Sequence, residues 1–400
     1  MPAHASPPEP AAHPTHALLL VSDDEALSLA LTHIAQPRGY RVVSALGARC
    51  LELVYELHPD ALVLDLSVPD ADPWVLLDRL KHDPRSRHVP VHLVGAEAQG
   101  HHALASGALG FLARPAADDA LARALDDAAS LVERSMRLLL VVEDDGGRRE
   151  DIVSLLGGDG VEVTAVAGRE ALEAIARGRY DAMVVGLDQA GGGGLDLLEA
   201  LSQRPELRRV PAVAYALDAL PAEDEARLSR LERSQVLRPA RTPDRLLDEC
   251  TLLLHRAQSS LPPTQREALL RSLESAPSLA GREVLLVDDD IHDVFALTGL
   301  LERHGVKVTC ARSGREALER LDERGDVDLV IMDVTRPQQE GYEATRAIRA
   351  RGDLAGVPVV ALTATTGERE SCLAAGAADC LVKPVEPDQL VSMLRVLLGS

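Results

Sequence analysis

The stretch EVLLVDDD, residues 283–290, places a short apolar run directly before three aspartates. An apolar run of this length is typical of a strand that is buried on both faces of a parallel sheet. The aspartates would then follow the carboxyl end of that strand, which is where open parallel sheets bind their ligands. The stretch therefore predicts an α/β protein with an acidic functional site.

Four further apolar runs follow this stretch, and helical patterns separate them. The helix that contains GREALE (314–319), for example, opens with Ser313 and Glu316 in the arrangement of a capping box. Strands and helices that alternate at this pitch favour a parallel, doubly wound sheet. The four runs are VKVTC (306–310), VDLVIM (327–332), VPVVAL (357–362) and DCLV (379–382).

The string GREALE also occurs at 168–173, and a weaker copy, GARCLE, occupies 47–52. Each copy lies between two apolar runs, so one unit is repeated three times along the chain. A segment with its own short helix, opened by Thr264 and Glu267, is inserted before the third unit. We predict a disordered tail (1–16), a first unit (17–134), a second unit (137–257), a linker with a short helix (258–281) and a third unit (282–400).

The composition excludes several classes of protein. The chain has 400 residues and a formal charge of -21, and no basic stretch offsets this charge, so we expect no binding of nucleic acid. Its five cysteines are scattered and form no C-x-x-C pair, which predicts neither a disulfide framework nor a zinc site. No signal peptide and no membrane insertion are predicted. We expect a soluble, cytoplasmic protein.

The third unit carries reactive side chains at the predicted ends of four strands. Three carboxylates at one rim repel one another by about 1–4 kcal/mol per pair, which favours a hard divalent cation between them. Mg²⁺ prefers carboxylate oxygens and bridges to phosphoryl groups, so the pattern predicts a phosphorylated aspartate. A hydroxyl and an ammonium group would hold the other phosphoryl oxygens. The residues at these strand ends are Asp288, Asp289, Asp290, Asp333, Thr363 and Lys383.

Over residues 282–400 the sequence resembles a response-regulator receiver domain, through the motifs VLLVDDD, VIMDVTRP, ALTA and LVKP. The resemblance implies a flavodoxin-like fold of five βα repeats, with strand order 2-1-3-4-5, in each of the three units. It implies that Asp288 and Asp289 bind Mg²⁺ together with Asp333 and the backbone carbonyl of Thr335. Asp333 would accept the phosphoryl group.

The same resemblance assigns two further residues of the third unit. Thr363 would reposition toward the phosphoryl group, and Lys383 would pair with it, next to a cis Lys383–Pro384 bond. The sequence departs from the family pattern in three places, because Arg336 replaces a methionine, Cys380 replaces the switch aromatic, and the loop after Thr363 is short. These departures affect the readout of a signal rather than phosphorylation itself.

The first unit resembles the same domain over residues 17–134, with Ser22 and Asp23 at the acidic positions and Asp65 at the acceptor position. Gly95 stands where the hydroxyl is expected, and Arg114–Pro115 replaces the Lys–Pro pair. An arginine can pair with phosphate, although its planar fork differs from the point charge of a lysine. Asp65 is therefore a second candidate acceptor, and its activity stays open.

The second unit has lost more of the pattern. Glu143 and Asp144 keep the acidic positions, but the acceptor position is Gly186, the hydroxyl position is Ala216, and Arg238 precedes the proline. Asp188, two residues beyond the acceptor position, is a weak substitute because it lies ~6–7 Å further along an extended chain. We interpret this unit as a pseudo-receiver.

The three units together resemble the carboxyl-terminal receiver array of bacterial hybrid histidine kinases, here without the kinase portion and without an output domain. The resemblance implies a phosphorelay protein that accepts a phosphoryl group from a partner histidine kinase or histidine phosphotransfer protein. The first two units would be interaction modules for a downstream protein partner. The amphipathic final run LVSMLRVLL implies a helix face that receivers use for homodimers or partners.

Two rival functions remain. A phosphorylation-independent scaffold is favoured by the incomplete sites of the first two units and by Cys380. A metal-dependent phosphohydrolase would use the same carboxylates, but the sequence has neither its Asp-x-Asp-x-Thr nucleophile pattern nor a substrate cap. We expect no enzyme activity beyond weak self-dephosphorylation.

Overall fold

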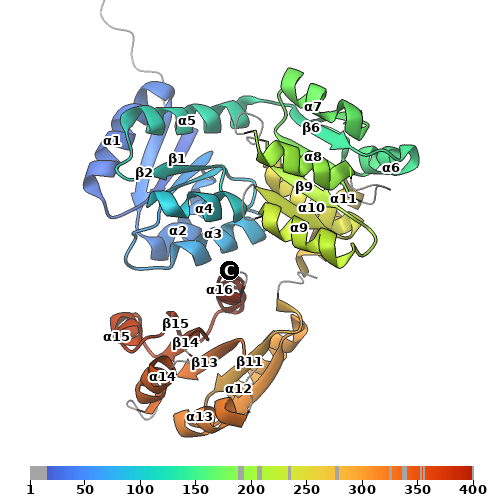
Figure 1. The fold of residues 1–400 in the computed structure, drawn as a ribbon. Coiled ribbons are helices and arrows are strands. Elements are labelled where there is room, and N and C mark those ends of the chain that lie inside the picture. Colours follow the sequence, from blue (N-terminus) through green and yellow to red (C-terminus); the bar gives the residue numbers. More distant parts are fainter. Residues whose placement is uncertain are drawn as a thin grey trace, which may run out of the picture. The chain divides into compact units, whose positions relative to one another are not determined.

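Three five-stranded parallel sheets follow one another along the chain in the computed structural model. The structure describes residues 16–187, 193–204, 210–232, 236–274, 279–323, 327–335, 340–351, 354 and 356–398. The first two sheets belong to one compact unit, Met1–Leu273, and the third belongs to another, Glu274–Ser400 (Figure 1). The predicted tail, except His16, lies outside the described residues.

The first sheet has the strand order β2-β1-β3-β4-β5, so that β1 lies between β2 and β3. Its β1 begins at His16, one residue before the predicted start of the first unit, because His16 already pairs with Tyr40. The strands are β1 (His16–Val21), β2 (Tyr40–Ala45), β3 (Ala61–Asp65), β4 (Val91–Gly95) and β5 (Gly110–Ala113). The helices are α1 (Glu25–Ala35), α2 (Cys50–Leu57), α3 (Pro73–His82), α4 (Gly100–Ala105) and α5 (Asp118–Glu133).

Helices cover both faces of this sheet, because successive side chains of β1 point to opposite faces. Leu19 packs in one core with Leu77 of α3, whereas its neighbour Leu18 packs in the other core with Leu121 of α5. All four side chains are buried, and burial of each contributes about 1.5–3 kcal/mol. This double burial explains why the strands appear in the sequence as continuous apolar runs.

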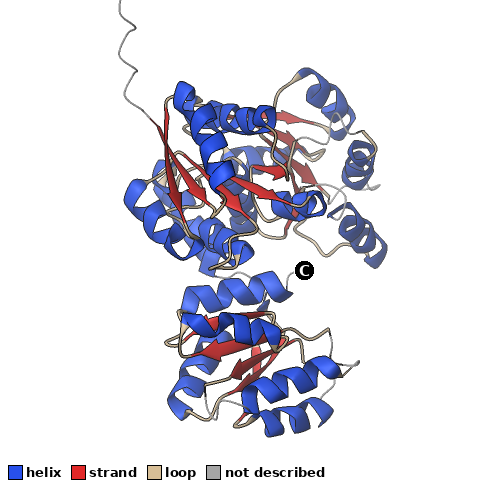
Figure 2. Ribbon diagram, turned by 90° about the vertical axis from the view of Figure 1, so that its left-hand side faces the viewer, coloured by secondary structure: helices blue, strands red, loops and turns tan. Residues whose placement is uncertain are grey.

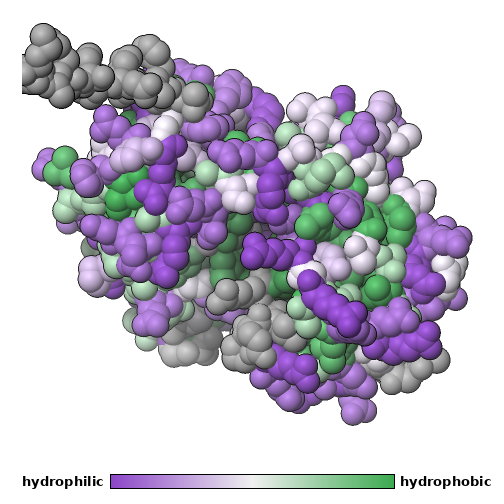
Figure 3. Space-filling model, turned by 90° about the horizontal axis from the view of Figure 1, so that it is seen from above, coloured by the Kyte–Doolittle hydropathy of each residue, from purple (hydrophilic) through white to green (hydrophobic). Residues whose placement is uncertain are grey.

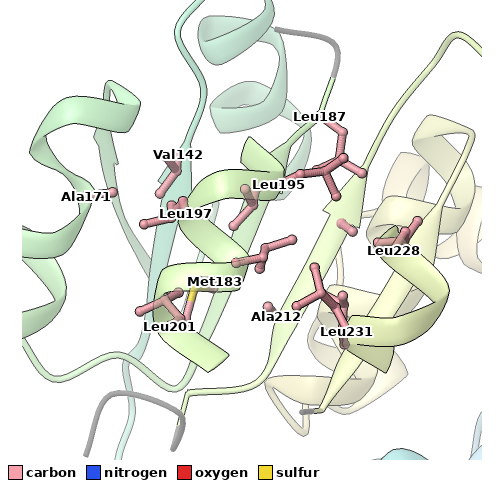
Figure 4. Close-up of a cluster of buried hydrophobic side chains, with 14 of the residues drawn as sticks. Val142, Ala171, Met183, Leu187, Leu195, Leu197, Leu201, Ala212, Leu228 and Leu231 are labelled. Atoms are coloured by element: carbon pink, nitrogen blue, oxygen red, sulfur yellow. The ribbon is translucent and has the colours of Figure 1, made fainter. Parts of the chain in front are cut away.

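The second sheet has the order β10-β9-β8-β6-β7. Counted from its other edge, this is β7-β6-β8-β9-β10, the same topology as in the first sheet. Figure 4 shows one of its cores, where Leu201 of α8 (Gly193–Ser202) lies near Met183 of β8 (Ala182–Gly186). The strands are β6 (Arg137–Val142), β7 (Val161–Val166), β8 (Ala182–Gly186), β9 (Ala212–Tyr215) and β10 (Leu237–Ala240). The helices are α6 (Gly146–Leu156), α7 (Gly168–Arg177), α8 (Gly193–Ser202), α9 (Ala222–Glu232) and α10 (Pro243–Leu253).

The predicted linker contains the expected short helix, α11 (Pro263–Glu274), which starts one residue before Thr264. This helix packs against the second sheet's helices. Ala268 joins a core of that sheet, and the Gln265 side-chain amide donates hydrogen bonds of 2.8 and 3.1 Å to the backbone oxygens of Leu155 and Gly157. All but the last residue of the helix therefore belong to the first compact unit.

The third sheet has the order β12-β11-β13-β14-β15, and helices cover both of its faces (Figure 2). The predicted strands are all present, although β12, β13 and β14 begin and end one or two residues later than predicted. The strands are β11 (Glu283–Val287), β12 (Lys307–Ala311), β13 (Leu329–Asp333), β14 (Val359–Thr363) and β15 (Asp379–Val382). The helices are α12 (Ile291–Arg303), α13 (Gly314–Glu323), α14 (Glu340–Ala350), α15 (Arg369–Ala374) and α16 (Pro387–Leu398).

The predicted fold class is confirmed, since all three sheets are parallel and have the order 2-1-3-4-5. Hydrophilic residues predominate on the surface that is visible in Figure 3, which agrees with the formal charge of -21. None of the helices that the structure describes is long and apolar enough to cross a membrane.

Candidate functional site

The acidic site of the third unit forms at the carboxyl edge of its sheet. Pairing of β11 with β13 aligns Val287 with Met332, so the next residues, Asp288 and Asp333, emerge side by side. Ligand oxygens of Asp288, Asp289 and Asp333 all lie within 4.8 Å of one another. Among the described residues, no other group of three acidic, histidine or cysteine side chains is arranged in this way.

Lys383, which follows β15, reaches into this cluster. Its Nζ lies 2.6 Å from Asp288, 2.7 Å from Asp333 and 2.9 Å from Asp293. Burial opposes the charged form of Lys383, but hydrogen bonds to these three carboxylates outweigh it and raise the pKa of the ammonium group. Asp293 was not predicted as a site residue, although it is acidic and lies in the first turn of α12.

The two buried carboxylates are held in fixed orientations. Oδ1 of Asp333 accepts hydrogen bonds of 2.7 and 2.6 Å from the backbone N–H and hydroxyl of Thr335, while its Oδ2 faces Lys383. Oδ1 of Asp288 accepts a bond of 2.8 Å from the backbone N–H of Asp290. Burial raises the pKa of Asp288, and its hydrogen bond with Lys383 opposes this effect.

The donor set fits a hard divalent cation. Asp288, Asp289 and Asp333 supply three carboxylates, and Asp293 adds a fourth negative charge beside Lys383, whose ammonium group contacts the cluster. A net negative charge therefore remains at the cluster, and oxygen donors of this kind are the preferred ligands of Mg²⁺. Asp289 is exposed, so the cation could keep part of its water shell there.

The two positions that carry the switch hydroxyl and the switch aromatic in the family, Thr363 and Cys380, match the family pattern only in part. Thr363, fully buried at the end of β14, donates its hydroxyl to the carbonyl oxygen of Thr365 at 3.1 Å, and so faces the backbone. Cys380 is buried in the core, where an aromatic ring was expected from the family pattern. The Lys383–Pro384 bond is cis, as predicted. Arg336 lies outside the described residues.

The corresponding site of the first unit is closed by an arginine. Asp65 is fully buried, and its Oδ2 contacts both the hydroxyl of Ser22, at 2.6 Å, and Nη2 of Arg114. Its Oδ1 accepts bonds of 2.9 and 2.7 Å from the N–H and hydroxyl of Ser67. Arg114 also lies 3.0 Å from Asp24, so one guanidinium group ties two carboxylates together.

Neighbouring side chains fill the space next to Gly95, where the hydroxyl of the first unit is missing. A Cβ atom at this position would lie 2.7 Å from both the Gln99 side chain and the Leu66 side chain. Contacts this short are not tolerated without a shift of the neighbours. The side chains of Gln99 and Leu66 thus occupy the volume in which the family has the hydroxyl.

In the second unit, Glu143 occupies the volume of the missing acceptor side chain. A Cβ atom at Gly186 would lie 2.1 Å from Oε2 of Glu143, which is itself buried and accepts a bond of 2.9 Å from the N–H of Asp145. Arg238 leaves the site and binds the backbone oxygen of Ala105, in the first receiver, at 2.6 Å. Asp188 lies outside the described residues.

Gly186→Ala is expected to lower the free energy of unfolding by about 1–3 kcal/mol, because the new methyl group displaces the buried Glu143 carboxylate. Urea unfolding followed by Trp74 fluorescence would measure this change in the first compact unit. Gly147→Ala in α6 is the control, since its added Cβ would meet its nearest neighbour, Asp145, at an ordinary 3.4 Å. Equal stability of the two variants would contradict the close packing at Gly186.

The parallel sheets and the acidic edge of the third one define a receiver-type α/β protein. The family model for the response regulator receiver domain matches residues 18–126 and 284–395, which together exceed half of the chain. The chain therefore belongs to the response regulator receiver domain family, whose proteins act in two-component signalling. The second sheet has the same topology as the two matched regions.

Similar proteins include a kinase and a small single-domain protein. The signal transduction histidine-protein kinase BarA of Escherichia coli is 29% identical over 223 residues, which are 54% of this chain and 22% of BarA. The chain thus matches only about a fifth of the length of that relative. Protein PilH of Pseudomonas aeruginosa is 31% identical over 119 residues, which are 29% of this chain and 98% of PilH.

A solved structure shows similarity over a single domain. It is the receiver domain of a sensor histidine kinase from Pseudomonas aeruginosa, with a magnesium ion coordinated in its active site cleft. The two sequences are 37% identical, and the match covers 30% of this chain and 100% of that domain, with a TM-score of 0.29.

Proposed function

We propose that this chain is a phosphorelay protein whose third receiver accepts a phosphoryl group on Asp333 from a partner histidine kinase or histidine phosphotransfer protein. The observation that carries the proposal is the convergence of Asp288, Asp289 and Asp333 within 4.8 Å, with Lys383 bonded to two of them. Only this receiver combines the acidic group, the hydroxyl and the lysine among the described residues.

Each side chain has a defined task in this proposal. Asp288 and Asp289 would hold Mg²⁺ together with Asp333 and the backbone carbonyl of Thr335, and the bound ion would supply positive charge next to the incoming phosphate. An oxygen of Asp333 would attack the phosphorus atom while the bond to the donor histidine nitrogen breaks. Lys383 would pair with a phosphoryl oxygen, and the Thr363 hydroxyl would turn from its backbone acceptor toward another.

The first two receivers would serve as interaction modules for a downstream protein partner. Their sites are filled by their own side chains, Arg114 against Asp65 and Glu143 against Gly186. The chain would act in the cytoplasm, form homodimers through the face of α16, and show no catalytic activity beyond weak self-dephosphorylation. A phosphorylation-independent scaffold is the second candidate, and the same two closed sites favour it.

The test is to incubate the full chain with acetyl phosphate and Mg²⁺, and to locate the acyl phosphate by mass spectrometry after borohydride trapping. Label is expected at Asp333, and this label should be lost in the Asp333→Asn variant. If Mg²⁺ binds but no residue is labelled, the scaffold replaces the phosphorelay proposal. A partner that binds Asp333→Asn and phosphorylated protein equally would also favour the scaffold.

Asp65 is expected to acquire at least tenfold less label than Asp333 in the same experiment. Its ion pair with Arg114 must open before Asp65 can react, and an opening cost of about 1.4 kcal/mol already lowers the rate of labelling tenfold. Both carboxylate oxygens of Asp65 are engaged, and Arg114 is one of the groups that must move away. Arg114→Ala measures this contribution and should raise the label at Asp65. Equal label at Asp65 and Asp333 in the unaltered chain would show that the first receiver is active.

A further inference from the structure

A cavity of about 460 Å³ lies in the first compact unit, at the junction of the first two receivers. Its walls include His58, just before β3, and His88, just before β4. The second receiver contributes Gly160, just before β7, and the segment that follows α10. These positions lie at the amino-terminal ends of the strands, so the cavity is separate from the carboxyl edges that carry Asp65 and Gly186.

Basic side chains dominate the polar part of the cavity wall. They are three arginines and three histidines: Arg134, Arg137, Arg256, His58, His88 and His255. The only acidic side chains in the wall are Asp60 and Asp159. In a chain with a formal charge of -21, the three arginines against these two aspartates reverse the overall sign locally.

Two of these arginines are held by backbone oxygens and have no carboxylate in an ion pair among the described residues. Nη2 of Arg256 donates to the carbonyl oxygen of Asp159 at 3.0 Å. Arg137 donates from Nε to the carbonyl oxygen of Leu254 at 3.0 Å and from Nη1 to that of Arg134 at 2.6 Å, which leaves its Nη2. Arg134, by contrast, forms an ion pair of 3.0 Å with Asp181. Arg137 and Arg256 therefore keep donors that an anion could use.

Burial makes the lack of a direct ion pair costly. The side chain of Arg256 is only 6% exposed, and His255 is only 9% exposed. Nδ1 of His255 and Nδ1 of His88 are both buried without a hydrogen-bond partner. Burial lowers the pKa of Arg256, and the charge of Arg137 lowers it further, so that together they outweigh the opposing charge of Asp159. A buried charge without an ion pair is destabilising by several kcal/mol, and an anion in the cavity would reduce this cost for Arg256.

We propose that this cavity binds a phosphate ester of mononucleotide size. The guanidinium groups of Arg137 and Arg256 match the geometry of a phosphate group. Leu131, Val89 and Pro90 form apolar wall on which a ring can pack. A volume of about 460 Å³ falls in the range of small-molecule sites, which is about 300–1,000 Å³.

Such a ligand would contact both receivers at once. Arg134 and Arg137 lie at the connection from α5 to β6, and Arg256 follows α10 of the second receiver. Because a ligand that binds only the folded state stabilises it, saturating ligand would raise the unfolding temperature of both receivers together. This role is independent of phosphorylation at Asp333.

Calorimetric titration of the full chain with adenosine monophosphate (AMP), in EDTA so that the acidic site of the third receiver is without metal, tests the proposal. Saturable binding of one AMP per chain is expected, with adenosine at least tenfold weaker because it lacks the phosphate group. Inorganic phosphate should compete with AMP. Absence of saturable AMP binding, or equal binding of adenosine, would overturn the proposal.

Variants locate the binding site. Arg256→Gln is expected to weaken AMP binding at least tenfold, whereas Arg123→Gln, on the exposed part of α5, should leave it unchanged. Since the buried Arg256 also supports the fold, Arg137→Gln provides a second test at a side chain that is only partly buried. Unchanged AMP affinity in a folded Arg256→Gln protein, or in Arg137→Gln where Arg256→Gln does not fold, would place the ligand elsewhere and overturn the assignment.

Discussion

Asp248→Ala is expected to lower the free energy of unfolding of the first compact unit by about 3–5 kcal/mol, because it leaves a buried arginine without its counter-charge. Arg87, before β4, and Asp248, in α10, form an ion pair between the first two receivers, and both are 2% exposed. Asp248 also binds Arg245 at 2.8 Å and the hydroxyl of Ser272 in α11 at 2.9 Å. One carboxylate thus joins three elements.

Urea unfolding followed by fluorescence of Trp74, the single tryptophan of the chain, measures this effect. Asp244→Ala is the matched control, because Asp244 lies on the same helix and pairs with Arg271 on the same partner helix, but at the surface. Its ion pair is exposed, so a change below about 1 kcal/mol is expected. A similar loss in both variants would mean that burial of the Arg87–Asp248 pair is unimportant.

The ion pair also gives a direction for the pH dependence. Burial opposes ionisation of Asp248, but Arg87 and Arg245 outweigh it, so the pKa of Asp248 in the folded protein is below its ordinary value. A depressed carboxylate pKa contributes stability above the unfolded pKa of about 4, and this contribution is lost as the pH falls through the lower folded pKa. Asp248→Asn should therefore reduce the loss of stability on acidification.

Lys383→Met is expected to slow phosphorylation of Asp333 about a hundredfold, and at the same time to tighten Mg²⁺ binding. A positioned donor to developing phosphoryl charge is typically worth a factor of about 10²–10³ in rate. In the unphosphorylated protein, however, Nζ of Lys383 lies between Asp288 and Asp333 and competes with a cation for their oxygens. Removal of the ammonium group therefore favours the metal and disfavours the reaction.

The two effects are measured separately, by Mg²⁺ titration and by the rate of acyl phosphate formation from acetyl phosphate. Lys307→Met is the control, because Lys307 belongs to the same receiver and its side chain is 69% exposed beside Glu283. Retained Mg²⁺ binding shows that the variant is folded. Unchanged labelling of a folded Lys383→Met protein would remove Lys383 from the proposed role.

The topology and the third acidic cluster could be predicted because their signals are local. Strand runs that are buried on both faces are visible as apolar strings, and residues at the ends of adjacent parallel strands must meet at one edge. Asp288, Asp289 and Asp333 meet in this way. The strands begin later than predicted because apolar residues such as Val357 precede the paired segments, and they end later because Asp333 and Thr363 still pair in the sheet.

Other contacts could not be predicted, because they depend on side-chain direction and on distant segments. The sequence shows that Gly186 lacks a carboxylate, but not that Glu143 fills the space. It shows Arg238 before a proline, but not that this arginine leaves its own site for Ala105. The Arg87–Asp248 pair joins residues that are 161 positions apart, and no local pattern indicates it.

Arg238 has a consequence for the cooperativity of folding. An arginine at the position of the family lysine now bonds the first receiver through Ala105 and its own helix α10 through Glu249, at 2.8 Å. If either receiver unfolded, charged groups of the other would lose their hydrogen-bond partners. The two receivers should therefore unfold in one thermal transition rather than in two. A domain without an acceptor aspartate can thus act as the thermodynamic partner that keeps its neighbour folded.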